Sequence, residues 1–490
     1  LAKGSLHHQY AHCWRCKNPV INRATEQWFA SVDGFRKEAL DAIDNQVQWI
    51  PSWGHDRIYN MVRDRGDWCV SRQRVWGVPI PVFYCEKCGE YEINDETIKS
   101  VQKWVEQEGS DAWWNHTAEE LLPEGFKCSH CGHDKFRKET DIMDVWFDSG
   151  SSWAGVLQVN GLDVPTAMYL EGSDQHRGWF NSSLLTGVAT MGKAPYNSVL
   201  THGFVVDGEG RKMSKSVGNT VAPSDIIDVY GADVMRLWVS SADYQGDVRL
   251  SKDIIKQLSD VYRKIRNTFR FLLGNLDDFN PNTDKVAYAD LQEIDKWALL
   301  RLEEVRAKVT EAYENYEFHV LYHAIHNFCT VDLSSIYLDI LKDTMYAETA
   351  TAPARRSAQT AIYEIVTTLM AMVTPVLSFT AEEVFQFLPK EDGMPESVML
   401  MDWPQAKEEY LNSDIKAKWD HLLDLRSEMT KALELARKDK TIGHPLDAAV
   451  TVYADGEAFT TLNALGHQGL AKLLIVSEAS VVEGKDKAPH

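Results

Sequence analysis

Two lysines in a short polar loop, RKMSKSVGN at residues 211–219, are the side chains best suited to chemistry on a highly charged substrate. Lys212 and Lys215 flank serines and follow an apolar stretch, 199–206, that is interrupted by His202 and Gly203. Ammonium groups, hydroxyls and backbone N–H groups suit a polyphosphate, because together they stabilise negative charge that moves during a reaction. Most charged loop residues are only solvated, so two lysines by themselves do not establish such a site.

A second polar cluster lies where a predicted strand at 166–170 meets a helix predicted from Gly178 onward. This cluster contains Glu171, Asp174 and Gln175. Open α/β sheets bind ligands at this kind of junction, where two carboxylates and an amide can hold an ammonium group and ribose hydroxyls. Spacing alone favours a simpler alternative, in which Asp174 and its neighbours only cap the helix that follows.

Six of the eight cysteines form three Cys-x-x-Cys pairs, and because we expect no secretory signal, metal binding is favoured over disulfides. Two of these pairs, Cys85 with Cys88 and Cys128 with Cys131, are each followed by a glycine that permits a tight turn. Four thiolates around one ion form a closed tetrahedral site, which predicts a structural zinc ion, with reduced, metal-free thiols as the alternative. The third pair supplies only half of such a site, so metal binding and free thiols both stay open for Cys13 and Cys16.

Strands and helices alternate around both polar clusters. A strand at 166–170, a helix from Gly178, a strand at 199–206 and a helix at 223–230 predict a parallel, Rossmann-like sheet. A strand that ends in a tight loop is predicted at 140–152, and a helix at 95–108 lies between the two cysteine pairs. The sequence therefore predicts an α/β nucleotide-binding domain that is interrupted by a zinc-knuckle insertion.

From residue 251 onward, apolar residues recur with helical spacing and predict an all-α bundle. The face formed by four basic residues on its first helix either contacts phosphates or is merely solvated. Thr380 and Glu383 have the spacing of a capping box. A helix at 415–440, a strand at 449–453 and an apolar run at 473–476 that suits a second strand predict a small α/β C-terminal piece. The four basic residues are Lys256, Arg263, Arg266 and Arg270.

The net charge of the 490-residue chain is −21, which excludes a general nucleic-acid-binding protein and requires any RNA contact to use local basic patches. No stretch approaches the roughly 20 apolar residues of a membrane span, so we expect a cytoplasmic protein without a membrane partner. The sequence opens at Leu1 in what reads as the middle of a domain, and we expect a fragment of a longer chain.

Taken together and in order, these strings resemble the class I aminoacyl-tRNA synthetases over essentially the whole chain. The loop KMSKS resembles their nucleotide-binding loop, and WCVSRQRVWG at 68–77 is similar to a string shared by the isoleucyl, valyl and leucyl members. EGSDQHRGWF at 171–180 resembles the isoleucyl members, and FHVLYHAIHNFC from Phe318 resembles their anticodon-binding bundle. The other nucleotide motif of the family, His-x-Gly-His, is absent, which implies that the first half of the catalytic domain is missing.

The resemblance implies a ligase that activates L-isoleucine with ATP and Mg²⁺ as isoleucyl-adenylate and transfers it to the isoleucine tRNA, as a monomer. It implies that Lys215, helped by Lys212, stabilises the phosphates and that Trp179 walls the isoleucine side chain. Valyl-tRNA synthetase and a tRNA-binding fragment without activity are the alternatives. The implied ATP-binding residues are His202, Gly203, Lys212, Met213, Ser214, Lys215 and Ser216. The implied adenylate-binding residues are Glu171, Gly172, Asp174, Gln175 and Trp179, and the implied tRNA-binding residues are Lys256, Arg263, Arg266 and Arg270.

The same resemblance predicts an order of domains. Residues 1–30 lead out of an editing insertion, 31–84 begin the catalytic domain, 85–139 form the zinc-binding insertion, and 140–250 carry the rest of the catalytic domain with the lysine loop. A basic connecting helix at 251–290, an anticodon-binding helical bundle at 291–405 and a partial C-terminal junction domain at 406–490 follow.

Overall fold

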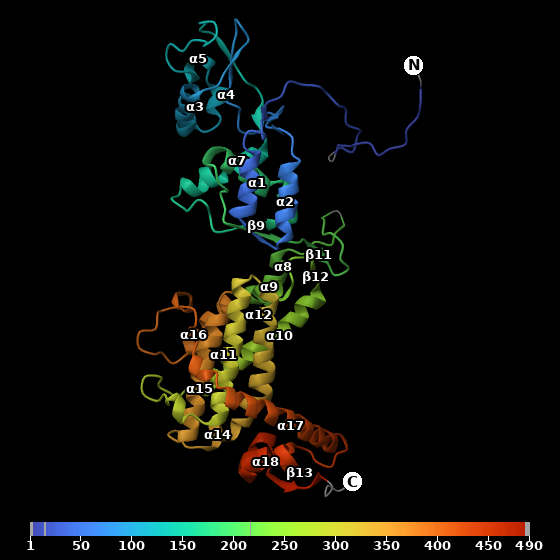
Figure 1. The fold of residues 1–490 in the computed structure, drawn as a ribbon, viewed down its shortest axis with the longest axis vertical. Helices are drawn as coiled ribbons and strands as arrows, with labels where there is room; N and C mark the ends of the chain where they lie inside the picture. The colour runs from blue at the N-terminus through green and yellow to red at the C-terminus, as the bar shows by residue number, and fades with distance from the viewer. Residues whose placement is uncertain (1–2, 14–15, 216, 486–490) are drawn as a thin grey trace. The chain divides into compact units, whose positions relative to one another are not determined.

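The computed structural model describes residues 3–13, 16–215 and 217–485. The chain folds as two compact units, 1–203 and 204–490 (Figure 1). Among the described helices, none has both the length and the apolar composition that a membrane span requires.

Three short parallel strands form the sheet at the centre of the first unit. β10 (Ser198–His202) lies between β2 (Gln48–Ile50) and β9 (Tyr169–Gly172), which confirms the predicted parallel pairing. His202 pairs with Gly172, so β9 and β10 end at the same edge of the sheet. The helices of this layer are α1 (Arg36–Asn45), α2 (Trp53–Arg63) and α7 (Trp179–Met191). Their shared apolar core includes Ile43, Ile58, Phe180, Leu184, Tyr196 and Val199.

A small subdomain with a core of its own carries the two central cysteine pairs. β5 (Phe83–Cys85) pairs with β6 (Tyr91–Glu92) and β7 (Phe136–Lys138) in an antiparallel sheet. The predicted helix is α3 (Asp95–Glu108), and the Asn94 side chain caps its first turn. Short helices α4 (Ala112–Asn115) and α5 (Ala118–Leu121) follow. The core of this subdomain includes Phe83, Trp113, Leu121 and Phe136.

The remaining pieces of the first unit surround the sheet, and one of them differs from the prediction. β1 (Phe29–Ala30) pairs with β3 (Trp68–Cys69), and β4 (Ser71–Arg72) pairs with β8 (Ile142–Met143). The tight loop predicted after β8 is wrong, because helix α6 (Val145–Gly150) and a π-helical turn, η1 (Trp153–Gln158), occupy that segment. The Asp144 carboxylate accepts a hydrogen bond from the Trp146 N–H at 3.3 Å and so begins α6. A 3₁₀ turn, η2 (Ser173–Arg177), joins β9 to α7.

The second unit begins with a parallel strand pair and continues as the predicted helical bundle. β11 (Val205–Asp207) pairs with β12 (Val248–Leu250), and α8 (Pro223–Tyr230) and α9 (Ala232–Ser241) connect them. The long helices α10 (Lys252–Gly274), α11 (Glu293–Glu314) and α15 (Pro353–Val373) share one continuous core. The other bundle helices are α12 (Phe318–Asn327), η4 (Phe328–Tyr337, π-helical), α13 (Leu338–Ile340), α14 (Lys342–Ala347) and α16 (Ser378–Phe387). Single 3₁₀ turns are η3 (Tyr288–Asp290), η5 (Val398–Leu400), η6 (Glu408–Tyr410) and η7 (Pro445–Asp447).

The C-terminal part of the second unit is a small α/β piece that follows the long helix α17 (Ser413–Lys438). β13 (Ala449–Ala454) is the predicted strand, and it pairs in parallel with β14 (Glu478–Glu483) across α18 (Gly456–Ala464) and α19 (Gly466–Leu474). The strand predicted at 473–476 is wrong. Leu470, Leu473 and Leu474 instead bury one face of α19, and Ile475 ends this helix in the left-handed conformation at φ 57°.

A carboxylate from another helix replaces the capping box predicted for Thr380 and Glu383. Helix α16 begins at Ser378, and its N-cap residue, Leu377, makes no side-chain capping bond. The buried carboxylate of Asp233 in α9 accepts hydrogen bonds from the Thr380 N–H at 2.8 Å and the Thr380 hydroxyl at 2.6 Å. The capping-box prediction is therefore wrong, because the cap comes from a residue that is distant in sequence.

We predict that Asp233→Ala lowers the free energy of unfolding by about 2–3 kcal/mol, because it leaves buried donors of α16 without an acceptor. Urea unfolding followed by far-UV circular dichroism measures this change. Asp228→Ala, on the exposed surface of α8, is the matched control and should cost less than about 0.5 kcal/mol. Equal losses in the two variants would contradict the capping role.

Candidate active site and metal centre

The carboxyl ends of β9 and β10 bring Glu171 and His202 together. The Glu171 carboxylate accepts a hydrogen bond from the Gly172 N–H at 3.0 Å, and its Oε2 lies 3.9 Å from the His202 Nε2. Glu171 is exposed, and the imidazole of His202 is partly exposed. The two side chains therefore remain available to a polar ligand at the edge of the sheet, where parallel α/β folds bind theirs.

Trp179, the first residue of α7, is held rigidly beside this edge. Its ring stacks on Tyr169, with centroids 3.9 Å apart and planes inclined by 12°. Its indole N–H contacts the Ser149 carbonyl at 3.0 Å and the Ser152 hydroxyl at 3.1 Å. Because both the ring face and the N–H are engaged, Trp179 is a fixed apolar wall.

Gln175, and not Asp174, satisfies the start of α7. The Gln175 Oε1 accepts a hydrogen bond from the Trp179 N–H at 2.9 Å, and neither η2 nor α7 has a side-chain cap at its N-cap residue. Asp174 is exposed. The simpler alternative, in which Asp174 only caps the helix, is therefore wrong, and its carboxylate is available to a ligand.

Two residues of this region that the sequence analysis did not single out pack against each other. A Cβ at Gly178 would lie 2.8 Å from the ring of Trp146 and 2.5 Å from the Gln175 Oε1, so a larger residue at this position would displace these side chains. Trp146 lies within the string that was predicted to end in a tight loop. Its proximity to Gly178 depends on the helix that formed there instead.

The lysine loop lies in the second unit and is organised around two side chains, Asp207 and Asn219. The Asp207 carboxylate accepts hydrogen bonds from the Asn219 Nδ2 at 3.0 Å and from the backbone N–H of Arg211 at 2.8 Å. These bonds hold the pKa of Asp207 well below its usual range. The Asn219 Oδ1 in turn accepts from the Ser214 N–H at 2.9 Å. The backbone of the loop is therefore fixed by internal contacts.

The internal contacts of the loop do not bury its two lysines. Lys212 and Lys215 are exposed, whereas the half-buried Met213 between them packs against the core of the second unit. Ser216 lies outside the described residues. Gly203 follows β10 at the end of the first unit, and its carbonyl oxygen lies 2.7 Å from the His202 Nδ1.

The four cysteines of the two central knuckles converge on one point, as predicted. All four Sγ atoms lie within 4.8 Å of one another, and the pairs Cys85–Cys131 and Cys88–Cys128 are each 3.6 Å apart. Four sulfurs at about 2.3 Å from a tetrahedral zinc ion would be about 3.8 Å apart, so this spacing fits a zinc ion.

Contacts around the thiols set their acidity and the shape of the knuckle. Burial opposes ionisation of Cys85, but the N–H groups of Cys88 and Lys87 and the neighbouring thiols outweigh it and lower its pKa to about 6. The buried Glu92 accepts hydrogen bonds from the Ser129 N–H at 2.7 Å and the Ser129 hydroxyl at 2.8 Å, which fixes the second knuckle. In the part of the chain that the structure describes, no third metal-ligating side chain joins the remaining pair, Cys13 and Cys16.

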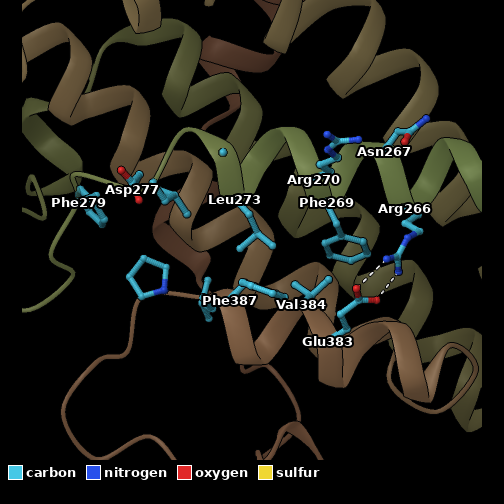
Figure 2. A pocket seen from close by; sticks show the side chains of 14 residues that line it. Arg266, Asn267, Phe269, Arg270, Leu273, Asp277, Phe279, Glu383, Val384 and Phe387 are labelled. Atoms are coloured by element: carbon cyan, nitrogen blue, oxygen red, sulfur yellow. Dashed lines mark hydrogen bonds and ion pairs between the residues drawn. The ribbon is translucent and has the colours of Figure 1, made fainter.

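The basic face of α10 is only partly available. Arg263 pairs with Asp260. Arg266 pairs with Glu383 of α16 through its two Nη atoms, as Figure 2 shows. Lys256 and Arg270 are exposed, and no carboxylate of the described residues forms an ion pair with either side chain. The structure therefore divides the four predicted RNA-binding residues into a neutralised pair and an available pair.

A groove of about 990 Å³ lies between α10 and α16, with Arg270 and Asn267 among its lining residues (Figure 2). Its apolar lining includes Leu273 and Phe387, and Phe387 is 73% exposed. A groove that combines guanidinium groups with an exposed aromatic ring suits an unstacked nucleobase and its phosphate.

Two family models match the chain. The model described as tRNA synthetases class I (I, L, M and V) matches residues 13–251, and the model described as anticodon-binding domain of tRNA ligase matches residues 295–452. The first range contains the residues at the sheet edge and also the lysine loop. The second range contains most of the helical bundle.

Curated relatives are identical to the chain at more than half of the aligned positions, over 98–100% of its length. The chain is 58% identical over 492 residues to the isoleucine–tRNA ligase of Caldanaerobacter subterraneus, a match that covers 100% of the chain and 52% of the relative. It is 59% identical over 482 residues to the isoleucine–tRNA ligase of Syntrophomonas wolfei, covering 98% of the chain and 52% of the relative. The chain thus spans about half the length of the curated relatives that it matches.

Solved structures confirm the fold. The Mycobacterium tuberculosis methionyl-tRNA synthetase in complex with methionyl-adenylate matches with a TM-score of 0.55 at 16% identity, covering 80% of the chain and 72% of that structure. The LeuRS–tRNA–LeuAMS ternary complex of Agrobacterium radiobacter matches with a TM-score of 0.52 at 20% identity, covering 71% of the chain and 43% of that structure. On the family models and the relatives together, the chain belongs to the class I aminoacyl-tRNA synthetases, within their isoleucyl group.

Proposed function

We propose that this chain forms part of an enzyme that activates L-isoleucine with ATP and transfers the resulting isoleucyl group to the isoleucine tRNA. The observation that carries this proposal is 58% identity over 492 residues to a protein named isoleucine–tRNA ligase. The predicted domain order, with 85–139 as a zinc-binding insertion and 291–405 as an anticodon-binding bundle, is part of the same proposal. Because an aminoacyl-tRNA synthetase works on soluble substrates, we also propose a cytoplasmic location. The monomeric state of the complete enzyme stays a prediction from the family resemblance.

The proposed first step needs charge stabilisation more than acid–base chemistry. The carboxylate of isoleucine attacks the α-phosphorus of ATP in line, and pyrophosphate leaves with the bonding electron pair. Cations aimed at the leaving phosphates stabilise the negative charge that develops on them. Lys215 and Lys212 suit this role, because the loop is fixed through Asp207 and Asn219 while both ammonium groups remain exposed.

We propose that the sheet edge of the first unit binds the aminoacyl-adenylate. Glu171 and Asp174 present exposed carboxylates there, which suit the ammonium group of the amino acid and the ribose hydroxyls. The rigid ring of Trp179 supplies an apolar wall for the isoleucine side chain. Gln175 and Gly172 complete this proposed pocket, and His202 and Gly203 extend it toward the nucleotide.

Two metals belong to this proposal in different ways. Mg²⁺ accompanies ATP and offsets part of its charge when bound. Zinc would be held by Cys85, Cys88, Cys128 and Cys131, whose spacing matches a tetrahedral site, and a site with four protein ligands leaves no open position for a substrate. We therefore assign the zinc ion a structural role.

We predict that Lys215→Ala lowers the rate of isoleucine-dependent pyrophosphate exchange by at least about 10²-fold, a typical loss for one electrostatic contact in a transition state. The assay needs a full-length enzyme that contains this chain, because the chain spans about half of its relatives. Lys193→Ala, an exposed lysine after α7, is the matched control. A loss below about threefold for Lys215→Ala would refute the role. Replacing isoleucine by valine in the same assay tests the valyl alternative.

We predict that the chain, purified without chelators, contains one zinc ion and that Cys128→Ser abolishes its binding, because three thiolates leave the tetrahedral site incomplete. Elemental analysis by mass spectrometry measures the ratio of zinc to protein. Cys69→Ser is the control, since a serine hydroxyl can replace the Cys69 thiol as donor to the Gln27 side chain. Metal-free parent protein, or full zinc in Cys128→Ser, would exclude this site.

We propose that the tRNA contacts α10 through its available cations, with an unstacked base in the groove beside α16. Lys256 and Arg270 are the exposed members of the predicted set, and Arg270 lines the groove. Arg263 and Arg266 must first exchange their carboxylate partners for phosphate, so they contribute less. This assignment refines the four-residue prediction made from the sequence.

We predict that Arg270→Ala weakens binding of the isoleucine tRNA to this chain and reduces the slope of log affinity against log salt by about one, the amount for one phosphate contact. Filter binding at several salt concentrations measures both effects. Arg263→Ala, whose guanidinium is already paired with Asp260, should change the slope less. An unchanged slope for Arg270→Ala, or a larger change for Arg263→Ala, would contradict the proposed contact.

A further inference from the structure

A polar cavity of about 210 Å³ lies in the first unit, and none of the residues proposed to bind the adenylate lines it, although its lining residue Gly178 neighbours Trp179. Segments that are distant in sequence enclose it: the strands β3 and β4, the start of α6 and the start of α7. The charged and polar side chains of its lining that bear on its ligand are Arg65, Asp67, Arg72, Asp144, Arg177 and Asn181.

The charges around this cavity favour an anion. Three guanidinium groups line it, against two carboxylates. The Asp144 carboxylate is already occupied, since its Oδ2 lies 3.0 Å from the Arg72 Nη2 and accepts from the Trp68 indole N–H at 2.9 Å. Asp67 is exposed and accepts a hydrogen bond from the Val32 N–H at 3.3 Å. The cavity therefore keeps an excess of positive charge, carried by Arg65 and Arg177.

Two polar groups of the lining have no hydrogen-bond partner among the described residues. The Nε of Arg65 is buried without an acceptor, although the guanidinium lies 5.5 Å from the ring centroid of Trp68. Asn181 is only 2% exposed, and its Oδ1 has no donor. Leaving a buried polar group unpaired is unfavourable, so both groups favour a ligand that satisfies them.

The start of α7 adds further donors. Gly178 precedes this 13-residue helix, and Asn181 and Ser182 belong to its first turn. The first N–H groups of a helix have no carbonyl one turn earlier, and the helix dipole favours negative charge beside them. Gln175 accepts from the Trp179 N–H and the Gly178 carbonyl accepts from the Ser182 N–H, so the N–H groups of Phe180 and Asn181 are the donors that this helix end can offer. The unpaired donor of Arg65 and this helix end therefore point to the same kind of ligand.

We propose that this cavity binds a phosphate group. A phosphate offers several acceptor oxygens to the guanidinium groups and the helix end. The volume of the cavity equals that of about seven water molecules at roughly 30 Å³ each, which leaves room for a sugar attached to the phosphate. A hydroxyl on the phosphate or on that sugar supplies the donor that the Asn181 Oδ1 lacks.

The phosphate has two chemical sources, a free anion such as phosphate or pyrophosphate, or a phosphodiester of single-stranded RNA. Isothermal titration of the 490-residue chain with sodium phosphate, sodium pyrophosphate and an RNA trinucleotide without terminal phosphate distinguishes them. Saturation by the simple anions alone identifies a free-anion site, and saturation by the RNA identifies a backbone site. Only the RNA arm rests on the proposed function, and neither arm requires amino-acid activation, so the two proposals can fail independently.

We expect Arg65→Gln and Arg177→Gln each to weaken binding at least about tenfold, which corresponds to about 1.4 kcal/mol for a charge-assisted hydrogen bond. Arg177 is exposed, so its variant retains the fold even if the partly buried Arg65 cannot be replaced. Arg63→Gln is the matched control, because Arg63 pairs with Asp64 and does not line the cavity. No saturable binding by any of the three probes, or parental affinity in Arg177→Gln, would overturn the proposal.

Discussion

The parallel pairing of β9 with β10 is the constraint on which the candidate site depends. This register sets Gly172 opposite His202, so two strands that are separated by a helix in sequence end at one edge. Backbone hydrogen bonds fix this alignment, and the side chains that follow each strand are placed by it without any contact of their own. For this reason the Glu171 Oε2 lies 3.9 Å from the His202 Nε2, with Glu171 exposed and His202 partly exposed.

A second principle of the site is the separation of roles within each polar segment. In the lysine loop, Asp207 and Asn219 take up the backbone donors, so the lysines are not needed to hold the fold. At the start of α7, Gln175 takes the helix amide and leaves Asp174 exposed. Residues that accept hydrogen bonds from backbone N–H groups therefore lie beside residues that remain available for a charged ligand. The first group fixes the backbone, and the second group is held in position without using its own polar atoms for that purpose.

The sequence predicted the features that depend on local pattern. The parallel strands, the helices at 95–108 and 223–230, the bundle and the convergence of four thiols all follow from spacing and turn residues, and the structure confirms them. The failures share a different cause. The cap of α16 comes from Asp233, which is 147 residues from Thr380 in sequence, and no local sequence pattern predicts such a partner.

The same limit explains why the sequence did not resolve the individual roles of basic residues. Arg266 and Arg270 have equivalent positions on one helix face, yet only the fold shows that Glu383 occupies one of them. Likewise, Arg65 and Asn181 carry no motif, and they line one cavity only because the segment between α2 and β3 lies beside the start of α7. Helical burial of Leu473 and Leu474 also required the tertiary context, since a short apolar run suits a strand equally well.

The pairing of Arg263 and Arg266 with carboxylates has a kinetic consequence for the proposed RNA binding. With these charges neutralised, and with a net charge of −21 on the chain, a polyanion is not drawn in from a distance. Attraction is confined to about one Debye length around the few available cations. Association should therefore be slower than steered encounter, and discrimination between RNAs would rest on how long a well-fitted molecule stays bound.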